Sequence, residues 1–112
     1  MRHRIGKVAL GFGVAVALGA VECPLVVVKR GADGAVARSA EGEVSAQPPT
    51  VEVVDATGAG DAFDAGFIAG RLSGMAIGGA LALACACGAL SARALGGVAA
   101  QPSMDEARAA MA

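Results

Sequence analysis

Apolar and polar positions fall into blocks along the chain, and the first blocks predict strands. Leu25–Lys29 is an unbroken β-branched run that ends in a charge, which is typical of a buried strand in a parallel sheet. Gly31–Gly34 is rich in turn-forming residues. Two shorter segments, Ala35–Arg38 and Glu43–Ala46, surround the polar turn Ser39–Gly42 and predict a β-hairpin.

The second half of the chain predicts helices. We expect a first helix over Asp61–Leu72, ended by Ser73-Gly74, because glycine just past the last turn is a common helix stop. Ala76–Leu95 is apolar nearly all round, so we expect it to be buried on more than one side. A short helix from Asp105 follows. The chain is therefore expected to be an α/β protein.

A Gly-rich loop joins the two halves, after the β-rich run Val51–Val54. Gly58, Ala59 and Gly60 have little or no side chain, so a ligand could approach their backbone closely. If Asp61 opens a helix, the free N–H groups at that helix start form a site for an anion such as a phosphate. A carboxylate beside an anion site is what phosphoryl transfer to a hydroxyl requires.

The loop Asp55-Ala56-Thr57-Gly58-Ala59-Gly60-Asp61, continued by Ala65-Gly66-Phe67, closely resembles the C-terminal signature D-T-x-G-A-G-D of the PfkB/ribokinase family of sugar kinases. Ala56 is the one departure, since threonine is usual there. Two other Gly-rich motifs are excluded. No lysine follows a glycine pair as in a P-loop, and Phe63 occupies the place of the third glycine of a dinucleotide-binding fingerprint.

The resemblance implies the fold and the reaction. The fold would be the C-terminal portion of a ribokinase-like three-layer αβα sandwich, with a mostly parallel sheet plus a β-hairpin. The activity would be ATP-dependent phosphorylation of a hydroxyl on a sugar or related small molecule, with Asp61 as the general base. Gly58, Ala59 and Gly60 would donate backbone N–H groups to the ATP phosphates, and Mg²⁺ would accompany the nucleotide.

Further site residues follow from the same resemblance. In this family a strand leads into a turn near the nucleotide, which makes Gly31 and Lys29 nucleotide-site candidates here. Lys29 is equally well explained as a solvated charge at the end of a strand. Gly88 begins a segment similar to the family's second nucleotide-contacting segment. Cys85 stands where the family often has an asparagine near the adenine, and a thiol cannot make the hydrogen bonds of an amide.

Many members of the family bind potassium beside the anion site. Asp55, Thr57 and Ser103 match the positions that would hold this monovalent cation. The alternative for Asp55 is a loop acid that caps backbone N–H groups.

Composition limits the partners. A net charge of −1 gives no electrostatic argument for nucleic acid or for an acidic membrane surface. The apolar fraction is 55%, above the typical 45–50%, so the chain either associates, for example as a homo-oligomer, or is a piece of a larger domain. Three cysteines, Cys23, Cys85 and Cys87, are expected to be small buried residues in a reducing compartment, here the cytoplasm.

Residues 1–21 have an uncertain status, and residues 22–112 are expected to be the nucleotide-binding and catalytic part. Arg2, Arg4 and Lys7 precede the uncharged run Val8–Val21, a pattern typical of a signal peptide cleaved near 15–17. The run is too short for a normal membrane span. The competing interpretations are a buried element of the kinase core and a misassigned start. We favour these two, because an ATP-dependent sugar kinase has no evident use for export.

The sugar-binding segment of the family is not found in the sequence, so the sugar cannot be named. An alternative function therefore stays open. The chain would then be a non-catalytic fragment, or a nucleotide-binding module that needs a partner or the missing N-terminal part.

Overall fold

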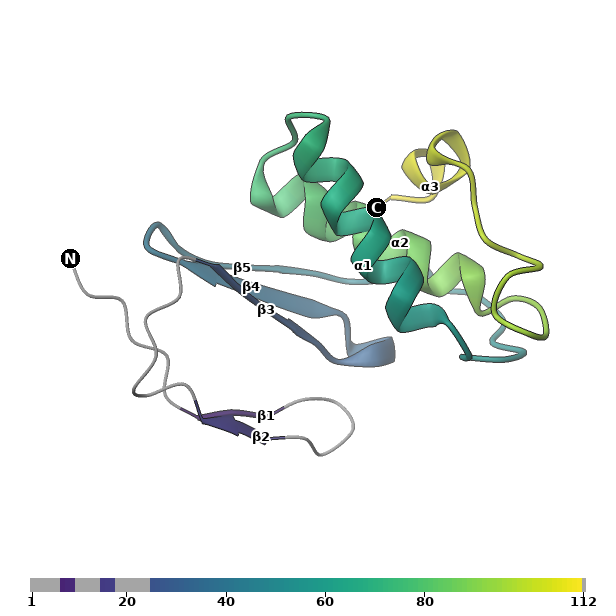
Figure 1. Cartoon of the computed structure of the whole chain (residues 1–112), viewed down its shortest axis with the longest axis horizontal. Coiled ribbons are helices and arrows are strands. Elements are labelled where there is room, and N and C mark those ends of the chain that lie inside the picture. The colour runs from purple at the N-terminus through teal and green to yellow at the C-terminus, as the bar shows by residue number, and fades with distance from the viewer. Residues whose placement is uncertain (1–6, 10–14, 18–24, 112) are drawn as a thin grey trace.

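The computed structural model describes residues 7–9, 15–17 and 25–111, and its strands and helices follow one another along the chain (Figure 1). In order, the elements are β1 (Lys7–Ala9), β2 (Ala15–Ala17), β3 (Leu25–Lys29), the 3₁₀ turn η1 (Gly31–Asp33), β4 (Ala35–Ser39), β5 (Gly42–Ala46), α1 (Ala59–Leu72), α2 (Ile77–Ser91) and α3 (Met104–Ala110).

Strands β3, β4 and β5 form one antiparallel sheet in that order, separate from the short β1–β2 ladder. The predicted hairpin is confirmed, since β4 and β5 pair from Ala35 opposite Ala46 to Ser39 opposite Gly42. The prediction of a buried parallel strand at Leu25–Lys29 is wrong. β3 pairs antiparallel with β4 along its whole length and is partly buried throughout. The connection through η1 is too short for the crossover that a parallel neighbour needs.

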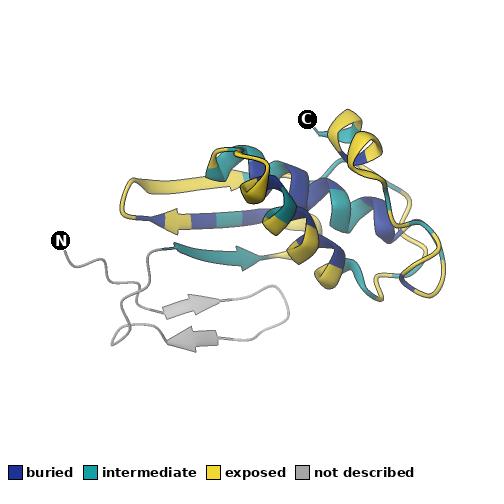
Figure 2. Cartoon of the chain, turned by 45° about the horizontal axis from the view of Figure 1, so that its top comes forward, coloured by how far each residue is buried: buried dark blue, intermediate teal, exposed yellow. Residues whose placement is uncertain are grey.

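The prediction of a mostly parallel sheet is therefore also wrong for the described residues, because every strand pair among them is antiparallel. The sheet of β3, β4 and β5 has a helical layer on one face, with α2 packed against β4 and β5 (Figure 2). Such an arrangement still fits a fragment of an α/β fold.

The core lies between β4 and helix α2. Ala35, Ala37 and Ser39 alternate onto the buried face of β4, as the period of a strand requires. Leu81 and Leu83 of α2 are fully buried, each worth roughly 1.5–3 kcal/mol relative to an exposed side chain. Helix α2 is enclosed by α1, the sheet and α3. The predicted burial on more than one side is confirmed for α2, whereas Arg93 and Leu95 near the end of the predicted run are exposed.

Helices α1 and α2 cross at short range because glycines lie at the contact. A Cβ at Gly66 would lie 2.8 Å from the Cys87 Sγ and 3.1 Å from the Ala84 Cα. A Cβ at Gly88 would lie 3.2 Å from the carbonyl oxygen of Ala59. The start of α1 is therefore packed directly on the last turn of α2, and this contact positions the Gly-rich loop.

Element boundaries differ little from expectation in the helices and more in the loop. α1 begins at Ala59, two residues before the predicted start, and ends with Ser73 and a left-handed Gly74, as predicted. α3 begins at Met104, one residue before the predicted start. The predicted β-rich run Val51–Val54 is not a strand, and the Val53 and Val54 side chains are exposed.

Most of residues 1–21 lies outside the described residues, apart from the strands β1 and β2. Among the described residues, no helix has the length and apolar character needed to cross a membrane.

Candidate functional site

The loop before α1 is tied to the segment that follows α2 by the carboxylate and backbone of Asp55 and by the Val54 N–H. The Asp55 Oδ1 accepts a hydrogen bond from the Thr57 N–H at 2.9 Å, and the Asp55 Oδ2 accepts one from the Gly96 N–H at 3.0 Å. The backbone N–H groups of Val54 and Asp55 both donate to the carbonyl of Ala92, at 2.8 and 3.1 Å. The loop is therefore fixed on both sides of Asp55.

Glycines allow the loop before α1 to touch the segment that follows α2. Gly58 precedes α1 in a left-handed conformation with φ of 77°, which costs glycine little. Gly97 lies so close that a Cβ on it would be 2.5 Å from the carbonyl oxygen of Thr57. A side chain at either position would push the loops apart and move the first turn of α1.

The first turn of α1 presents free hydrogen-bond donors. Among the described residues, the N–H groups of Gly58, Gly60 and Asp61 have no acceptor, whereas the Ala62 N–H bonds to the Gly58 carbonyl at 2.9 Å. The Ala59 N–H, predicted as a donor to phosphate, instead donates to the Ala56 carbonyl at 3.0 Å. The turn thus offers three free donors at the positive end of a helix dipole.

Asp61 follows directly on these donors. It is the third residue of α1, its side chain is exposed, and it makes no hydrogen bond or ion pair with any described residue. An acid at this position is also favoured by the helix dipole. The carboxylate is therefore free to accept a proton from a bound hydroxyl.

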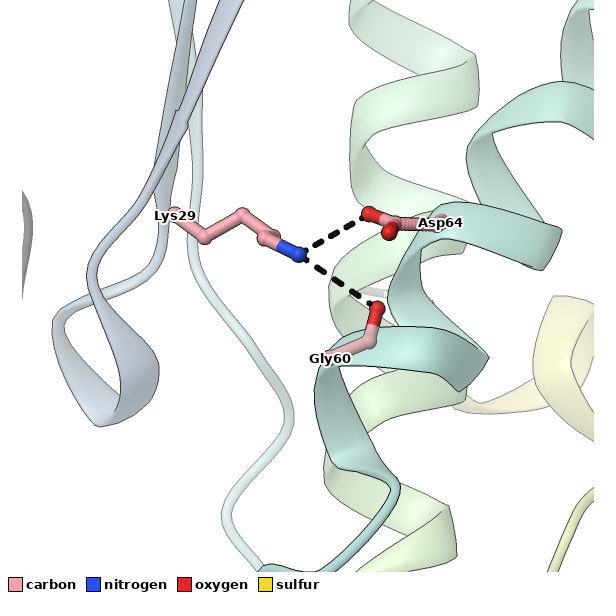
Figure 3. Close-up of polar contacts among 3 residues, drawn as sticks. All are labelled: Lys29, Gly60 and Asp64. Atoms are coloured by element: carbon pink, nitrogen blue, oxygen red, sulfur yellow. Dashed lines mark hydrogen bonds and ion pairs between the residues drawn. The ribbon is translucent and has the colours of Figure 1, made fainter.

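Lys29, the last residue of β3, reaches across to the same turn (Figure 3). Its Nζ lies 2.9 Å from the Asp64 Oδ1 and 3.5 Å from the Gly60 carbonyl oxygen. The Nζ also lies 5.6 Å from the centre of the Phe63 ring, within the range of a cation–π contact. Sheet and helix are thus joined at the site by a charged side chain.

Comparison with known proteins identifies the family. The family model described as pfkB family carbohydrate kinase matches residues 13–104, which is most of the chain. The chain belongs to the PfkB family. Its recognition from the loop signature is confirmed.

Individual PfkB relatives support this assignment. The chain is 39% identical over 89 residues to an aminoimidazole riboside kinase of Salmonella typhimurium. It superposes with a TM-score of 0.75 and 38% identity on a protein from E. coli provisionally assigned as a ribokinase II and bound to ATP and Mg²⁺. It also superposes, with a TM-score of 0.69 and 35% identity, on a Vibrio cholerae fructokinase variant bound to fructose, ADP and potassium.

The chain covers only part of these PfkB proteins. The match includes 75% of this chain but 28% of the Salmonella kinase. For the two structures it includes 79% and 80% of this chain, and 29% and 31% of theirs. The chain thus spans about a third or less of the length of the relatives that it matches.

Of the other predicted site residues, Lys29 and Gly88 lie against the PfkB signature loop, whereas Gly31 and Ser103 do not. Gly88 faces α1 at Ala59, so in this structure it permits helix packing. Gly31 is exposed at the start of η1. The Ser103 hydroxyl accepts from the Glu106 N–H at 3.1 Å in a capping box that starts α3. Among the described residues, neither Gly31 nor Ser103 bonds to the signature loop.

The contacts of Asp55 match the capping alternative, because both of its oxygens accept backbone N–H groups. Thr57 shares one of these bonds, whereas Ser103 is engaged elsewhere. The three residues predicted to bind a monovalent cation are therefore not assembled into one ligand set by the contacts of the described chain. The potassium site stays a prediction.

The cysteines in the described residues are free. Cys85 is buried, as predicted, and burial raises the pKa of its thiol to about 11, so it stays neutral. Cys87 is partly buried against Gly66, and burial also raises the pKa of its thiol. Cys23 lies outside the described residues.

Three residues important for the geometry are not singled out by the sequence pattern. Gly96 and Gly97 lie at the end of the segment that begins with Gly88. The Gly96 N–H holds Asp55, and Gly97 contacts Gly58. Asp64 by itself is explained as an acid favoured near a helix start, and its pairing with Lys29 is visible only in the structure. The paired glycines at 96 and 97 were the available signal of a close backbone contact.

Acid should weaken the hold of Asp55 on the loops. The Gly96 N–H, then the side chain and N–H of Thr57, lower the pKa of Asp55 from 3.8 to about 2. Because the folded-state pKa is the lower one, this stabilisation is fully present above pH 3.8 and is lost as the pH falls through about 2. We expect Asp55→Asn to lower the thermal midpoint at pH 7, with the difference from the parent disappearing towards pH 2.

Thermal unfolding followed by circular dichroism at stepwise lower pH measures this difference. Glu52→Gln, at an exposed acid in the preceding segment, is the matched control and should leave the midpoint unchanged at each pH. A constant gap between Asp55→Asn and the parent across the whole pH range would contradict the charge-based role of Asp55.

Proposed function

We propose that this chain forms the ATP-binding and catalytic part of a kinase that phosphorylates a hydroxyl of a sugar or related small molecule. One observation carries the proposal. Among the described residues, the exposed carboxylate of Asp61 is unpaired, and it lies next to the free N–H groups of Gly58, Gly60 and Asp61 itself. Donors for an anion and an acceptor for a proton are therefore adjacent.

The chemistry divides between these groups. The substrate hydroxyl oxygen would form a bond to the γ-phosphorus of ATP as the bond from that phosphorus to the departing ADP oxygen breaks. The Asp61 carboxylate would take the hydroxyl proton, and the free N–H groups would hold the negative charge of the transferring phosphoryl. The Gly58 conformation and the Asp55 contacts keep these donors in place before ATP binds.

Mg²⁺ supplies charge neutralisation on the ATP phosphates when it is bound. The described residues contain no group of three or more His, Cys, Asp or Glu that could hold a metal ion by themselves. A Mg²⁺ that accompanies a nucleotide is held mainly by phosphate oxygens and water, with few ligands from the protein. We propose ATP with Mg²⁺ as the cofactor on this basis, and the neighbour bound to both supports it.

Gly60→Val tests the phosphate cradle. A Cβ at Gly60 would meet only the Lys29 Nζ, at 3.5 Å, so the free protein has room for the first carbon of a side chain. A bound phosphate would not leave that room, and we expect ADP affinity to fall by about tenfold or more, about 1.4 kcal/mol. Calorimetric titration of the complete protein with ADP and Mg²⁺ measures the change.

Gly78→Val is the control for this experiment. Gly78 lies in α2, and a Cβ there would have open space around it. ADP affinity should be unchanged. Equal ADP affinities of the parent and Gly60→Val would show that the first turn of α1 does not contact phosphate.

A second candidate function rests on the length of the match. Since the chain spans only about a third or less of its relatives, it would by itself bind nucleotide without phosphorylating a sugar. The described part also leaves large apolar side chains exposed, namely Ile68, Leu72, Leu95 and Val98. Association of the chain with itself or with a partner therefore stays a prediction. Phosphorylation of any sugar by the 112-residue chain alone would exclude this second function.

The substrate class is left broad because the relatives differ. The Salmonella relative is named for an aminoimidazole riboside, and the Vibrio neighbour was bound to fructose. Two relatives that match the same chain are thus named with different substrates, so the match by itself does not identify the substrate. The cytoplasmic location and the absence of nucleic-acid binding likewise stay predictions.

A further inference from the structure

Lys29 makes three contacts to the first two turns of α1, to Gly60, Phe63 and Asp64. The charge pair with Asp64 is short at 2.9 Å, but the side chains are 42% and 58% exposed. An exposed pair of this kind contributes little to stability. The contacts to the Gly60 carbonyl and to the Phe63 ring are longer, at 3.5 and 5.6 Å. The arrangement is therefore better suited to holding a geometry than to stabilising the fold.

The geometry that it holds includes the candidate base. The carbonyl of Gly60 and the N–H of Asp61 belong to one peptide plane. The Lys29 ammonium lies on the carbonyl side of this plane, and the Asp61 N–H on the other side has no acceptor among the described residues. Fixing the carbonyl therefore fixes the direction in which the Asp61 N–H points. Asp64, one turn further along α1, holds the ammonium in place (Figure 3).

We propose that Lys29 is a positioning residue, held by Asp64, that orients the Gly60–Asp61 peptide and with it the Asp61 N–H and carboxylate. The proposal rests on the proposed kinase function for its effect on rate. The contact itself is a property of the chain, so it can be measured independently. Lys29 acts through α1 here and needs no contact of its own with phosphate.

This role differs from the nucleotide contact suggested by the resemblance, and Asp64 separates the two. If Lys29 bound phosphate directly, Asp64 would compete for the ammonium, and Asp64→Asn would strengthen nucleotide binding. If the pair positions α1, Asp64→Asn and Lys29→Met impair the same step. The two variants should then lower kcat together, by about tenfold each, with the Kd for ADP changed less than about threefold.

The experiment uses the complete protein and four variants. Lys29→Met and Asp64→Asn break the pair, and Lys29→Arg, which keeps the charge, should restore most of kcat. Arg38→Met is the control. Arg38 pairs with Glu43 at 3.2 Å across β4 and β5, with 47% and 52% exposure, away from α1. It should leave kcat and the Kd for ADP unchanged.

Amide hydrogen exchange gives a readout that does not need activity. In Lys29→Met and Asp64→Asn, the Ala62 N–H, which bonds to the Gly58 carbonyl, should exchange about twofold to fivefold faster than in the parent. Exchange in α3 should not change. If the parent has no kinase activity, the proposed function fails, and this exchange measurement alone decides the positioning role.

Three results would overturn the proposal. The first is a rise in ADP affinity in Asp64→Asn combined with a fall in Lys29→Met, which would make Lys29 a phosphate ligand. The second is that Lys29→Met and Asp64→Asn both have the kcat, the Kd for ADP and the Ala62 N–H exchange rate of the parent. Lys29 would then be a solvated charge at the end of a strand. The third is Lys29→Arg with a kcat as low as that of Lys29→Met.

Discussion

Replacing Asp61 with asparagine is expected to lower kcat by about 10²–10⁴-fold, because a positioned general base contributes a factor of this size. The amide keeps the shape of the carboxylate but cannot accept the hydroxyl proton. The backbone N–H groups of Gly58, Gly60 and Asp61 remain, so the Kd for ADP should change little. Steady-state phosphorylation kinetics and calorimetry on the complete protein measure the two quantities.

Asp105→Asn is the matched control for this variant. Asp105 is also an exposed aspartate in the first turn of a helix, here α3, so the two substitutions change helix-start charge in the same way. Its kcat should equal that of the parent. A kcat of Asp61→Asn within a few-fold of the parent would remove Asp61 from the role of base.

The second large effect is on the packing of α1 against α2. Gly66→Ala would place a Cβ 2.8 Å from the Cys87 Sγ and 3.1 Å from the Ala84 Cα, which is backbone and cannot rotate away. The helices must separate or shift, and overpacking of this kind costs about 1–3 kcal/mol. Urea unfolding followed by circular dichroism should show a lower midpoint with an unchanged slope.

Replacing Gly78 with alanine, in contrast, should not destabilise the protein. Gly78 also lies in a helix, α2, but a Cβ there meets nothing within 4 Å. Gly78→Ala is therefore expected to be neutral or stabilising, by at most about 1 kcal/mol, since alanine favours the helix. Equal midpoints for the two variants would contradict the close crossing of α1 and α2.

A displaced α1 would also affect the site. Gly88 and Gly66 place the beginning and the middle of α1 on α2, and the free donors lie at the beginning. A variant that separates the helices is therefore expected to reduce nucleotide binding together with stability. Asp61→Asn, in contrast, should reduce only the rate. The two largest predicted effects can thus be told apart in the same assays.

Local features of the fold were predictable because their causes lie within a few residues. The hairpin of β4 and β5 follows from two short segments around one polar turn. The stop of α1 follows from Ser73-Gly74, and the left-handed Gly74 is as expected. The start of α1 was placed two residues late, because Ala59 and Gly60 were treated as loop.

The pairing of Leu25–Lys29 was not predictable from its own composition. A continuous β-branched run is typical of a parallel strand, but the neighbour is decided by the chain that follows. Here the turn Arg30–Gly34 closes with a 2.8 Å bond from the Arg30 N–H to the Gly34 carbonyl, so the chain reverses at once. A local run determines that a strand forms, and the connection determines its partner.

The sequence by itself determined the family, the signature loop and the candidate base Asp61, because these depend on residue identity at fixed spacing. Only the tertiary structure decided that Lys29 meets Asp64, 35 residues away, and that Gly96 meets Asp55, 41 residues away. It also decided that the Ala59 N–H is engaged with Ala56. Contacts over such separations depend on how the helices pack on the sheet, and no local pattern of residues encodes that packing.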